Sequence, residues 1–275
     1  KPAVWDALMP NTGLTALIRN LANLTRIGWL DERERLDYVV NRLNSEEDLT
    51  IARIHPLAIL LAASTYSAGR GYRGTNTWDA NPAVVKALDS AFYKAFRNVE
   101  PIGQNIYIGL DVSSSMMGSY VAGSNLSASE AAAALSMLYL RTEPKVIIKA
   151  FTTQMKDPGL KATDSLKDVL RKTQNVAFGG TDCALPMLDA MKNHYDVDLF
   201  MVLTDSETWA GNIHPFQALQ RYRDTMQKPN AKLVVVGLTA NEFTIADPND
   251  GGMLDVVGMD ASVPSIIRAF ALGQI

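Results

Sequence analysis

Apolar side chains recur every three or four residues through the first hundred residues of the chain. The first such stripe lies between Thr12, a residue type that caps helices, and Gly28, which ends them; its members are Leu14, Leu17, Ile18, Leu21 and Leu24. Similar stripes predict three more helices, over 33–43, 56–68 and 81–96. Successive short helices of this kind are typical of HEAT-like helical-hairpin repeats. We therefore expect residues 1–100 to form a helical-repeat segment.

After residue 100 the pattern changes to short apolar runs that alternate with helical stripes. The runs predict buried strands over 106–111, 145–151, 198–204 and 232–238. Helices are predicted between these strands and, at the end, over 263–272. Alternation of strands and helices implies a mainly parallel sheet with helices on both faces. We expect an α/β, Rossmann-like domain over 101–275.

Oxygen-bearing side chains follow the predicted strands at the points where they end. The segment 105–117 reads NIYIGLDVSSSMM, so Asp111, Ser113 and Ser115 lie directly after the first strand. Thr181 follows a double glycine, and Asp205 follows the third strand. The carboxyl ends of parallel strands meet at one edge of a sheet, where ligands bind. Two carboxylates and three hydroxyls suit a single Mg²⁺ or Mn²⁺ ion that keeps a coordination position open for an incoming acidic ligand.

The alternative is that these residues only stabilise the turns in which they lie. Aspartate and serine side chains often accept hydrogen bonds from the backbone of the turn that follows them, with no metal involved. Three such loops in the expected order favour the metal site over this interpretation. Asp182 and Glu207 flank the metal positions and could tune the site from beside the ligands or cap helices; capping is the favoured interpretation.

Composition limits the classes of function. Of 275 residues, 47% are hydrophobic and 20% charged, as expected for a globular chain, and a net charge of −3 gives no overall footprint for nucleic acid. The single cysteine, Cys183, forms no internal disulfide, and we interpret it as a small core residue. No apolar stretch reaches the ~20 residues of a membrane span and no signal peptide pattern opens the chain, so we expect a soluble, cytoplasmic protein without a membrane partner.

Enzyme chemistry is not supported by the residues present. The three histidines, His55, His194 and His214, are scattered, and two precede prolines at predicted helix starts, where capping is the expected role. A phosphotransferase of the haloacid dehalogenase kind needs a second aspartate where Ser113 stands, and there is no Gly-x-x-x-x-Gly-Lys phosphate loop. We expect a binding protein that is not an enzyme.

One loop in the helical segment has a composition suited to RNA. Residues 69–78 read GRGYRGTNTW and combine Arg70 and Arg73 with Tyr72 and Trp78, a mixture used for phosphate pairing and base stacking. The alternative is a surface loop between two repeat helices whose aromatic side chains pack inward. Both interpretations are open from the sequence.

The motif Asp111-Val-Ser113-Ser-Ser115, with Thr181 and Asp205 downstream, resembles the metal-ion-dependent adhesion site of von Willebrand factor A domains. This resemblance implies that Ser113 and Ser115 ligate the ion directly, Thr181 directly or through water, and the two aspartates mainly through water. Further stretches, among them GGTDCALPM, FMVLTDSETWAG and IHPLAILLAASTY, resemble the Ro autoantigen (TROVE) family over essentially the whole chain. Members of that family join a ring of helical repeats to a von Willebrand A-like domain and bind small noncoding Y RNAs and the ends of misfolded RNAs. They also carry more helical repeats ahead of the part seen here.

The resemblance implies that this chain is a component of an RNA-binding ribonucleoprotein that serves in RNA quality control. Its metal site is expected to dock an acidic group of a partner, either an RNA phosphate or a carboxylate of a protein such as a ribonuclease. The alternative is a metal-dependent protein interaction module that binds no RNA by itself, because its ring of repeats is incomplete.

Overall fold

The computed structural model describes residues 2–72, 75–174, 179–205, 210–239 and 245–275 of the chain. These residues form two compact units. One consists of residues 1–100 with 123–126, and the other of residues 101–122 with 127–275. No single helix in the described ranges is long and apolar enough to cross a membrane; one bent pair, Glu46–Ala52 with Pro56–Ser67, passes by length and composition only.

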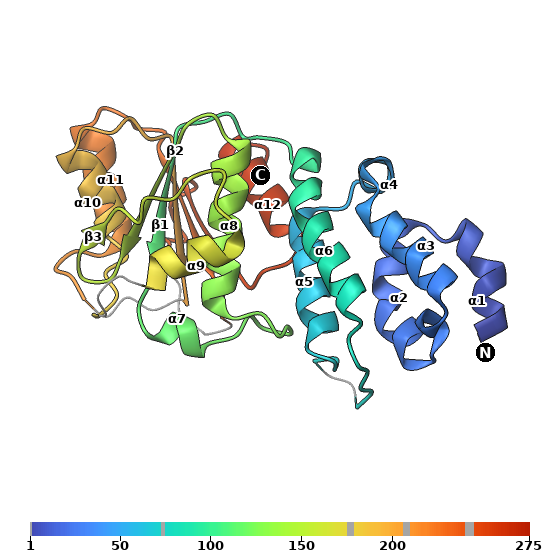
Figure 1. Cartoon of the computed structure of the whole chain (residues 1–275). Coiled ribbons are helices and arrows are strands. Elements are labelled where there is room, and N and C mark those ends of the chain that lie inside the picture. Colours follow the sequence, from blue (N-terminus) through green and yellow to red (C-terminus); the bar gives the residue numbers. More distant parts are fainter. Residues whose placement is uncertain (1, 73–74, 175–178, 206–209, 240–244) are drawn as a thin grey trace. The chain divides into compact units, whose positions relative to one another are not determined.

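The first unit is built from helices (Figure 1). They are α1 (Pro2–Leu8), α2 (Leu14–Arg26), α3 (Arg33–Asn44), α4 (Glu46–Ala52), α5 (Pro56–Ser67) and α6 (Pro82–Lys94), with 3-10 turns at Met9–Asn11, Trp29–Asp31 and Ala95–Asn98. The four predicted helices are confirmed as α2, α3, α5 and α6; α1 and α4 were not expected from the apolar pattern. Figure 1 shows α5 and α6 antiparallel and side by side, as in a helical hairpin.

Local chemistry explains where these helices begin and end. Gly28 has φ +72°, the left-handed conformation that ends α2 and that glycine adopts without strain. The His55 Nδ1 atom accepts a hydrogen bond from the Leu57 N–H at 3.2 Å and so caps α5, and His214 does the same for α11 (Pro215–Thr225) of the second unit. The expected capping role of both histidines is confirmed.

The second unit contains one six-stranded sheet in the order β3-β2-β1-β4-β5-β6. All neighbouring strands are parallel except the short edge strand β3. The strands are β1 (Ile106–Asp111), β2 (Val146–Phe151), β3 (Met155–Lys156), β4 (Leu199–Thr204), β5 (Lys232–Gly237) and β6 (Met253–Val257). The helices are α7 (Ser115–Gly118), α8 (Ala128–Thr142), α9 (Leu166–Gln174), α10 (Leu185–Lys192), α11 (Pro215–Thr225) and α12 (Val263–Ala271). The predicted parallel sheet is confirmed, and β3 and β6 are additions at its edges.

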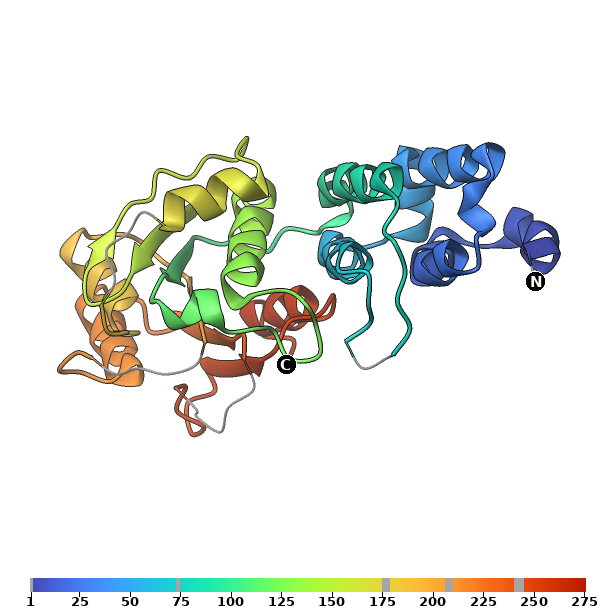
Figure 2. The same ribbon diagram turned by 60° about the horizontal axis from the view of Figure 1, so that its bottom comes forward.

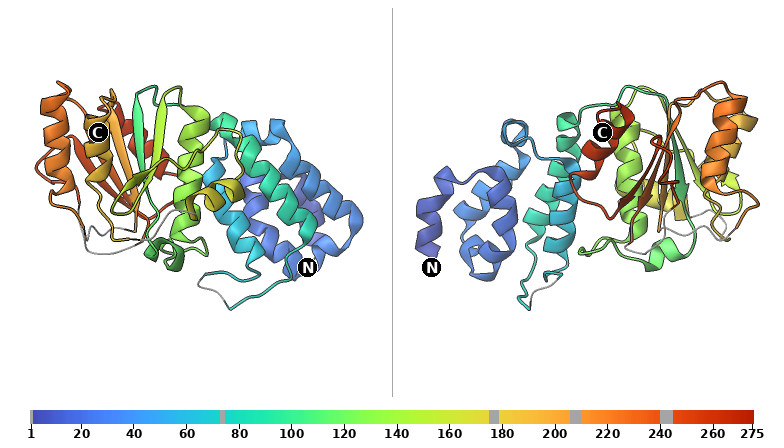
Figure 3. Two further views of the ribbon diagram at one scale, coloured as in Figure 1. Left: turned by 60° about the vertical axis from the view of Figure 1, so that its left-hand side comes forward. Right: turned by 180° about the vertical axis from the view of Figure 1, so that it is seen from behind.

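Helices cover both faces of this sheet. Figure 2 shows α8 and α9 side by side on one face, and the right-hand view of Figure 3 shows α10 and α11 on the opposite face. Every residue of β1 and of β4 is buried, because these are the two central strands. Gly109 of β1 lets α10 approach closely: a Cβ atom at this position would lie 2.3 Å from the Cγ atom of Pro186.

The connections diverge between the two central strands. The chain leaves β1 through α8 on one face to reach β2, and it leaves β4 through α11 on the other face to reach β5. Loops on either side of such a switch point move apart, which opens a crevice at the carboxyl ends of the strands. Asp111 and Asp205 follow β1 and β4 at this crevice.

Candidate metal centre

Asp111 is the innermost side chain at the crevice. It is only 2% exposed, and both carboxylate oxygens accept hydrogen bonds: one from the Ser113 N–H at 2.8 Å, the other from the Thr204 hydroxyl at 2.7 Å. Burial raises the pKa of Asp111 to about 6, because a desolvated carboxylate resists ionisation; the two hydrogen bonds oppose this rise, and the negative charge of Asp205 adds to it. The site therefore contains a carboxylate whose negative charge its protein neighbours stabilise only in part.

The two serines place hydroxyl oxygens beside this carboxylate. The Ser113 and Ser115 Oγ atoms are 3.1 Å apart; Ser113 is buried, whereas Ser115 is exposed at the start of α7. Backbone hydrogen bonds from Val112 to the Phe151 carbonyl at 3.1 Å and from Met116 to the Ser113 carbonyl at 3.2 Å fix the loop that carries them. The structure thus brings Asp111, Ser113 and Ser115 together, as predicted.

Thr181 and Asp205 reach the same edge on separate loops. Thr181 is 4% exposed, its carbonyl accepts a hydrogen bond from the Ala210 N–H at 3.0 Å, and the next residue, Asp182, donates its N–H to the Thr152 carbonyl beyond β2. Asp205 is half-buried, and its carbonyl accepts a hydrogen bond from the Thr239 hydroxyl at 2.7 Å. These bonds hold the loops after β2, β4 and β5 to one another around the site.

Thr204 is the functional residue that the sequence analysis did not identify. Its hydroxyl is fully buried and bonds to a carboxylate 93 residues away in sequence. The available signal was a polar residue at the end of a strand that is otherwise entirely apolar, next to Asp205. A buried hydroxyl at such a position needs a partner, and Asp111 is that partner.

The residues flanking the site have structural roles where the structure describes them. Asp182 Oδ1 accepts a hydrogen bond from the Ala184 N–H at 3.0 Å in the turn ahead of α10, whose N-cap is Ala184, so Asp182 does not cap this helix as expected; burial raises the pKa of Asp182. Cys183 is fully buried in the core, as expected. Glu207 lies outside the described residues.

The donor set fits a hard divalent cation. Carboxylate and hydroxyl oxygens are the ligands that Mg²⁺ and Mn²⁺ prefer, and the partly compensated charge of Asp111 favours a cation nearby. Across the described ranges no group of three His, Cys, Asp or Glu side chains is placed to hold a metal ion, so a soft-ligand zinc site is not indicated there. The residues that could hold an ion are Asp111, Ser113, Ser115, Thr181 and Asp205.

The residues of the loop considered for RNA contact, 69–78, differ in how they pack and how exposed they are. The Trp78 indole N–H donates to the Tyr66 carbonyl at 2.8 Å, and the two rings stack with centroids 6.4 Å apart, so Trp78 packs inward. Arg70 forms a β-bridge with Thr77, and Tyr72 is 56% exposed. Arg73 lies outside the described residues. Of the two aromatic residues, only Tyr72 presents a largely exposed ring.

A parallel sheet in this strand order, with an aspartate and two alternate serines after the first strand, defines a von Willebrand factor A domain. The sequence model of the Ro60 vWA domain matches residues 105–271, and that of the TROVE domain matches residues 1–68. The chain therefore belongs to the Ro60 family, which confirms the family resemblance seen in the sequence.

Individual relatives agree with this assignment. The chain is 46% identical over 275 residues to RNA-binding protein RO60 of Deinococcus radiodurans, covering 99% of the chain and 52% of the relative. It is 42% identical over 273 residues to RNA-binding protein RO60 of Caenorhabditis elegans, covering 99% of the chain and 42% of the relative. The crystal structure of the Deinococcus radiodurans RO (RSR) protein superposes with a TM-score of 0.93 at 46% identity, over 99% of this chain and 55% of that one. The chain thus spans about half the length of the curated relatives it matches.

Proposed function

We propose that this chain is part of an RNA-binding protein that assembles with small noncoding RNA, of the Y RNA kind, or with misfolded RNA in cytoplasmic RNA quality control. The support is the likeness along 99% of the chain to two proteins named RNA-binding protein RO60. These relatives carry the name of binding proteins, which agrees with a role that involves no catalysis. The second unit, which contains the von Willebrand factor A domain and is called the vWA unit below, would provide a docking site for a partner.

The docking site consists of one Mg²⁺ or Mn²⁺ ion held by Asp111, Ser113, Ser115, Thr181 and Asp205. The observation that supports it is the buried Asp111 carboxylate with two hydroxyls next to it, an arrangement that costs free energy unless a cation is bound. A bound ion would supply an open coordination position for an anionic group. The residues of this chain would hold that ion in place and neutralise only part of its positive charge.

Metal-dependent stabilisation tests the ion. A ligand that binds only the folded state raises the free energy of unfolding by about 2.7 kcal/mol at a hundredfold excess over its dissociation constant. We expect Mg²⁺ to stabilise the wild-type chain and the Asp224→Ala variant, which loses an exposed carboxylate on α11. The Asp111→Ala variant should fold and show no response. A wild-type chain that is indifferent to both Mg²⁺ and Mn²⁺ would remove the metal from the proposal.

Salt-dependent RNA binding tests the RNA function. Phosphate contacts release counterions, so the affinity for a structured RNA should fall steeply as salt is raised. Replacing Arg70 or Tyr72 by alanine should weaken binding, whereas Arg33→Ala, at an arginine whose side chain is 94% exposed in another part of the helical unit, should not.

A second function is favoured if this RNA test fails. Trp78 packs inward, and the chain covers only about half of each relative, so the RNA binding named for the relatives can belong to the part of them that this chain does not match. The vWA unit would then act as a metal-dependent protein interaction module. Binding of RNA that is weak and unaffected by Arg70→Ala and Tyr72→Ala would support this second function.

A further inference from the structure

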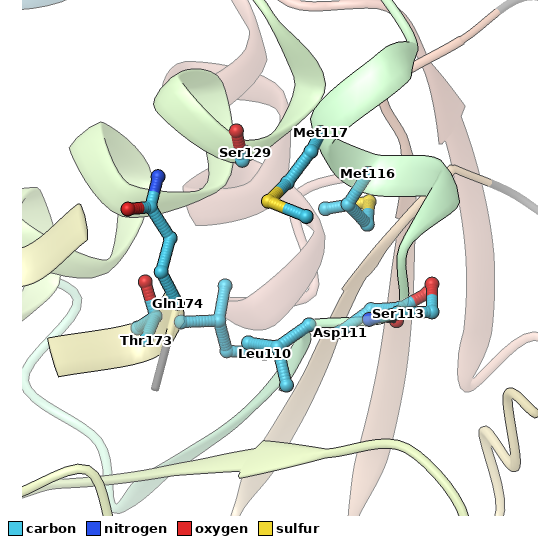
Figure 4. A pocket seen from close by; sticks show the side chains of 9 residues that line it. Leu110, Asp111, Ser113, Met116, Met117, Ser129, Thr173 and Gln174 are labelled. Atoms are coloured by element: carbon cyan, nitrogen blue, oxygen red, sulfur yellow. Dashed lines mark hydrogen bonds between the residues drawn. The ribbon is translucent and has the colours of Figure 1, made fainter. Parts of the chain in front are cut away.

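A small pocket adjoins the candidate metal centre. Its walls come from four elements: Leu110 of β1, Met116 and Met117 of α7, Ser129 of α8 and Thr173 of α9 (Figure 4). Figure 4 shows the Met117 side chain pointing into the pocket from α7, above Leu110. The cavity volume is about 20 Å³, room for one small group of the size of a water molecule or a methyl group.

The pocket and the metal centre share a wall. Asp111 and Ser113 line the pocket and also belong to the donor set. A partner whose acidic group completes the coordination of the ion therefore places the neighbouring part of its structure over this pocket. The chemistry of the pocket then selects what that neighbouring part is.

The side-chain oxygens of Asp111, Ser129 and Thr173 in the pocket wall are already used within the protein, and the exposed Gln174 adds a side-chain amide at its rim. The Thr173 hydroxyl bonds to the carbonyls of Val169 and Leu170, both at 3.0 Å, and the Ser129 hydroxyl lies 3.2 Å from that of Ser127. Both oxygens of Asp111 accept the hydrogen bonds described above. The nine lining residues include no lysine, arginine or histidine. A second phosphate of an RNA backbone would find no cationic side chain among these described residues, whereas an aliphatic group would contact the side chains of Leu110, Met116 and Met117.

One wall of the pocket is an exposed apolar side chain, that of Met117. Met117 is 43% exposed and Tyr120, three residues later, is 62% exposed. Methionine side chains adapt their shape to a partner, which makes them common at binding surfaces. Single exposed apolar residues are ordinary, but Met117 also lines the pocket that adjoins the metal centre.

We propose that the occupant of this face is a protein segment in which a metal-binding aspartate or glutamate is accompanied by a small aliphatic side chain that fills the pocket. This proposal rests on the metal site of the proposed function and names the class of partner that the site takes. It assigns Leu110, Met116 and Met117 to the recognition of the aliphatic side chain. RNA phosphate is the competing ligand, and the test below separates the two.

Small carboxylates test the pocket without knowledge of the partner. Dissociation constants of acetate, 3-methylbutanoate and dimethyl phosphate are measured by ligand-observed NMR on the full chain with saturating Mg²⁺. Each methylene group that is buried strengthens binding about fourfold, and the pocket holds one such group, so 3-methylbutanoate should bind about fourfold more tightly than acetate. Dimethyl phosphate should bind no more tightly than acetate.

Two variants change the pocket in opposite ways. Met117→Ser removes one wall, and Ser129→Thr adds one methyl group to the cavity while keeping the hydroxyl; both should abolish the preference for 3-methylbutanoate and leave the affinity for acetate and the stabilisation by Mg²⁺ unchanged. Val257→Ser serves as the control, because Val257 is 56% exposed and lies on β6, outside the pocket.

The outcomes distinguish this inference from the metal site on which it rests. Equal affinities for acetate and 3-methylbutanoate, together with normal stabilisation by Mg²⁺, overturn the pocket and leave the metal site in place. Tighter binding of dimethyl phosphate than of either carboxylate overturns the protein partner in favour of RNA. Absence of any stabilisation by Mg²⁺ overturns the metal site and the inference together.

Discussion

The buried charge of Asp111 leads to a quantitative prediction for the metal-free protein. The Asp111→Asn substitution keeps the shape of the side chain and removes the charge. The amide oxygen can still accept from the Ser113 N–H, and the amide nitrogen can donate to the Thr204 hydroxyl. We therefore expect the variant to fold and to be more stable than the wild type at neutral pH when no metal is bound.

The magnitude follows from the pKa. Burial raises the pKa of Asp111 from 3.8 to about 6, and about 1.4 kcal/mol per pKa unit gives about 3 kcal/mol. Between these two values the folded state holds more protons than the unfolded state, so the wild-type free energy of unfolding falls as pH rises from 4 to 6 or above. The advantage of Asp111→Asn should be near zero at pH 4 and about 3 kcal/mol at pH 7.5.

The reactivity of Cys183 provides a suitable assay. This is the only cysteine of the chain and it is fully buried in the vWA unit, so a thiol reagent reaches it only when that unit opens. Labelling across a urea series, with chelator, gives the free energy of unfolding of this unit alone at pH 5 and pH 7.5. Asp224→Asn, an equal change of charge at an exposed position on α11, is the control.

Two results would refute the reasoning. The first is an Asp111→Asn variant that is no more stable than the wild type at pH 7.5 without metal. The second is a difference between the two proteins that stays constant from pH 5 to pH 7.5. Mg²⁺ at about a thousandfold excess over its dissociation constant should reverse the order, because it adds about 4.1 kcal/mol to the wild type alone.

Two further predictions concern packing. Gly109→Ala should lower the free energy of unfolding of the vWA unit by about 3 kcal/mol, because the new Cβ atom would overlap the buried Pro186 ring. Gly251→Ala is the control: a Cβ atom there meets open space, and the change should be neutral within about 0.5 kcal/mol. Equal stabilities of the two variants in a urea titration would contradict the close packing of α10 on β1. Trp78→Ala should destabilise the helical unit by about 2 kcal/mol, because it removes the stack on Tyr66 and the indole hydrogen bond. Tyr72→Ala, at an exposed ring, should have little effect. Thermal unfolding followed by circular dichroism at 222 nm compares the two variants, and equal melting temperatures would show that Trp78 does not anchor the loop.

The elements that the sequence did not reveal are too short, or too interrupted by polar residues, for a hydrophobic period to show. Strand β6 has Asp255 at its centre, which interrupts the apolar run; the structure accommodates this carboxylate because it accepts hydrogen bonds from the Ala246 N–H at 3.2 Å. Strand β3 has only two residues, too few for any alternation to show. Helix α4 has seven residues, a length at which the helical period is hard to detect, and its start depends on the Ser45 cap.

The sequence by itself determined the kinds of residues at the candidate centre and the loops that carry them, because a strand buried on both faces and the polar residues at its end leave a local pattern. It also determined the helical and the α/β halves through their different periods. The strand order and the register were decided only by the tertiary structure. Pairing Leu110 with Leu203 brings Asp111 against the Thr204 hydroxyl, although 93 residues separate them. Such pairings depend on the fit of two distant surfaces, and a shift of register by one residue would turn Thr204 to the other face of the sheet.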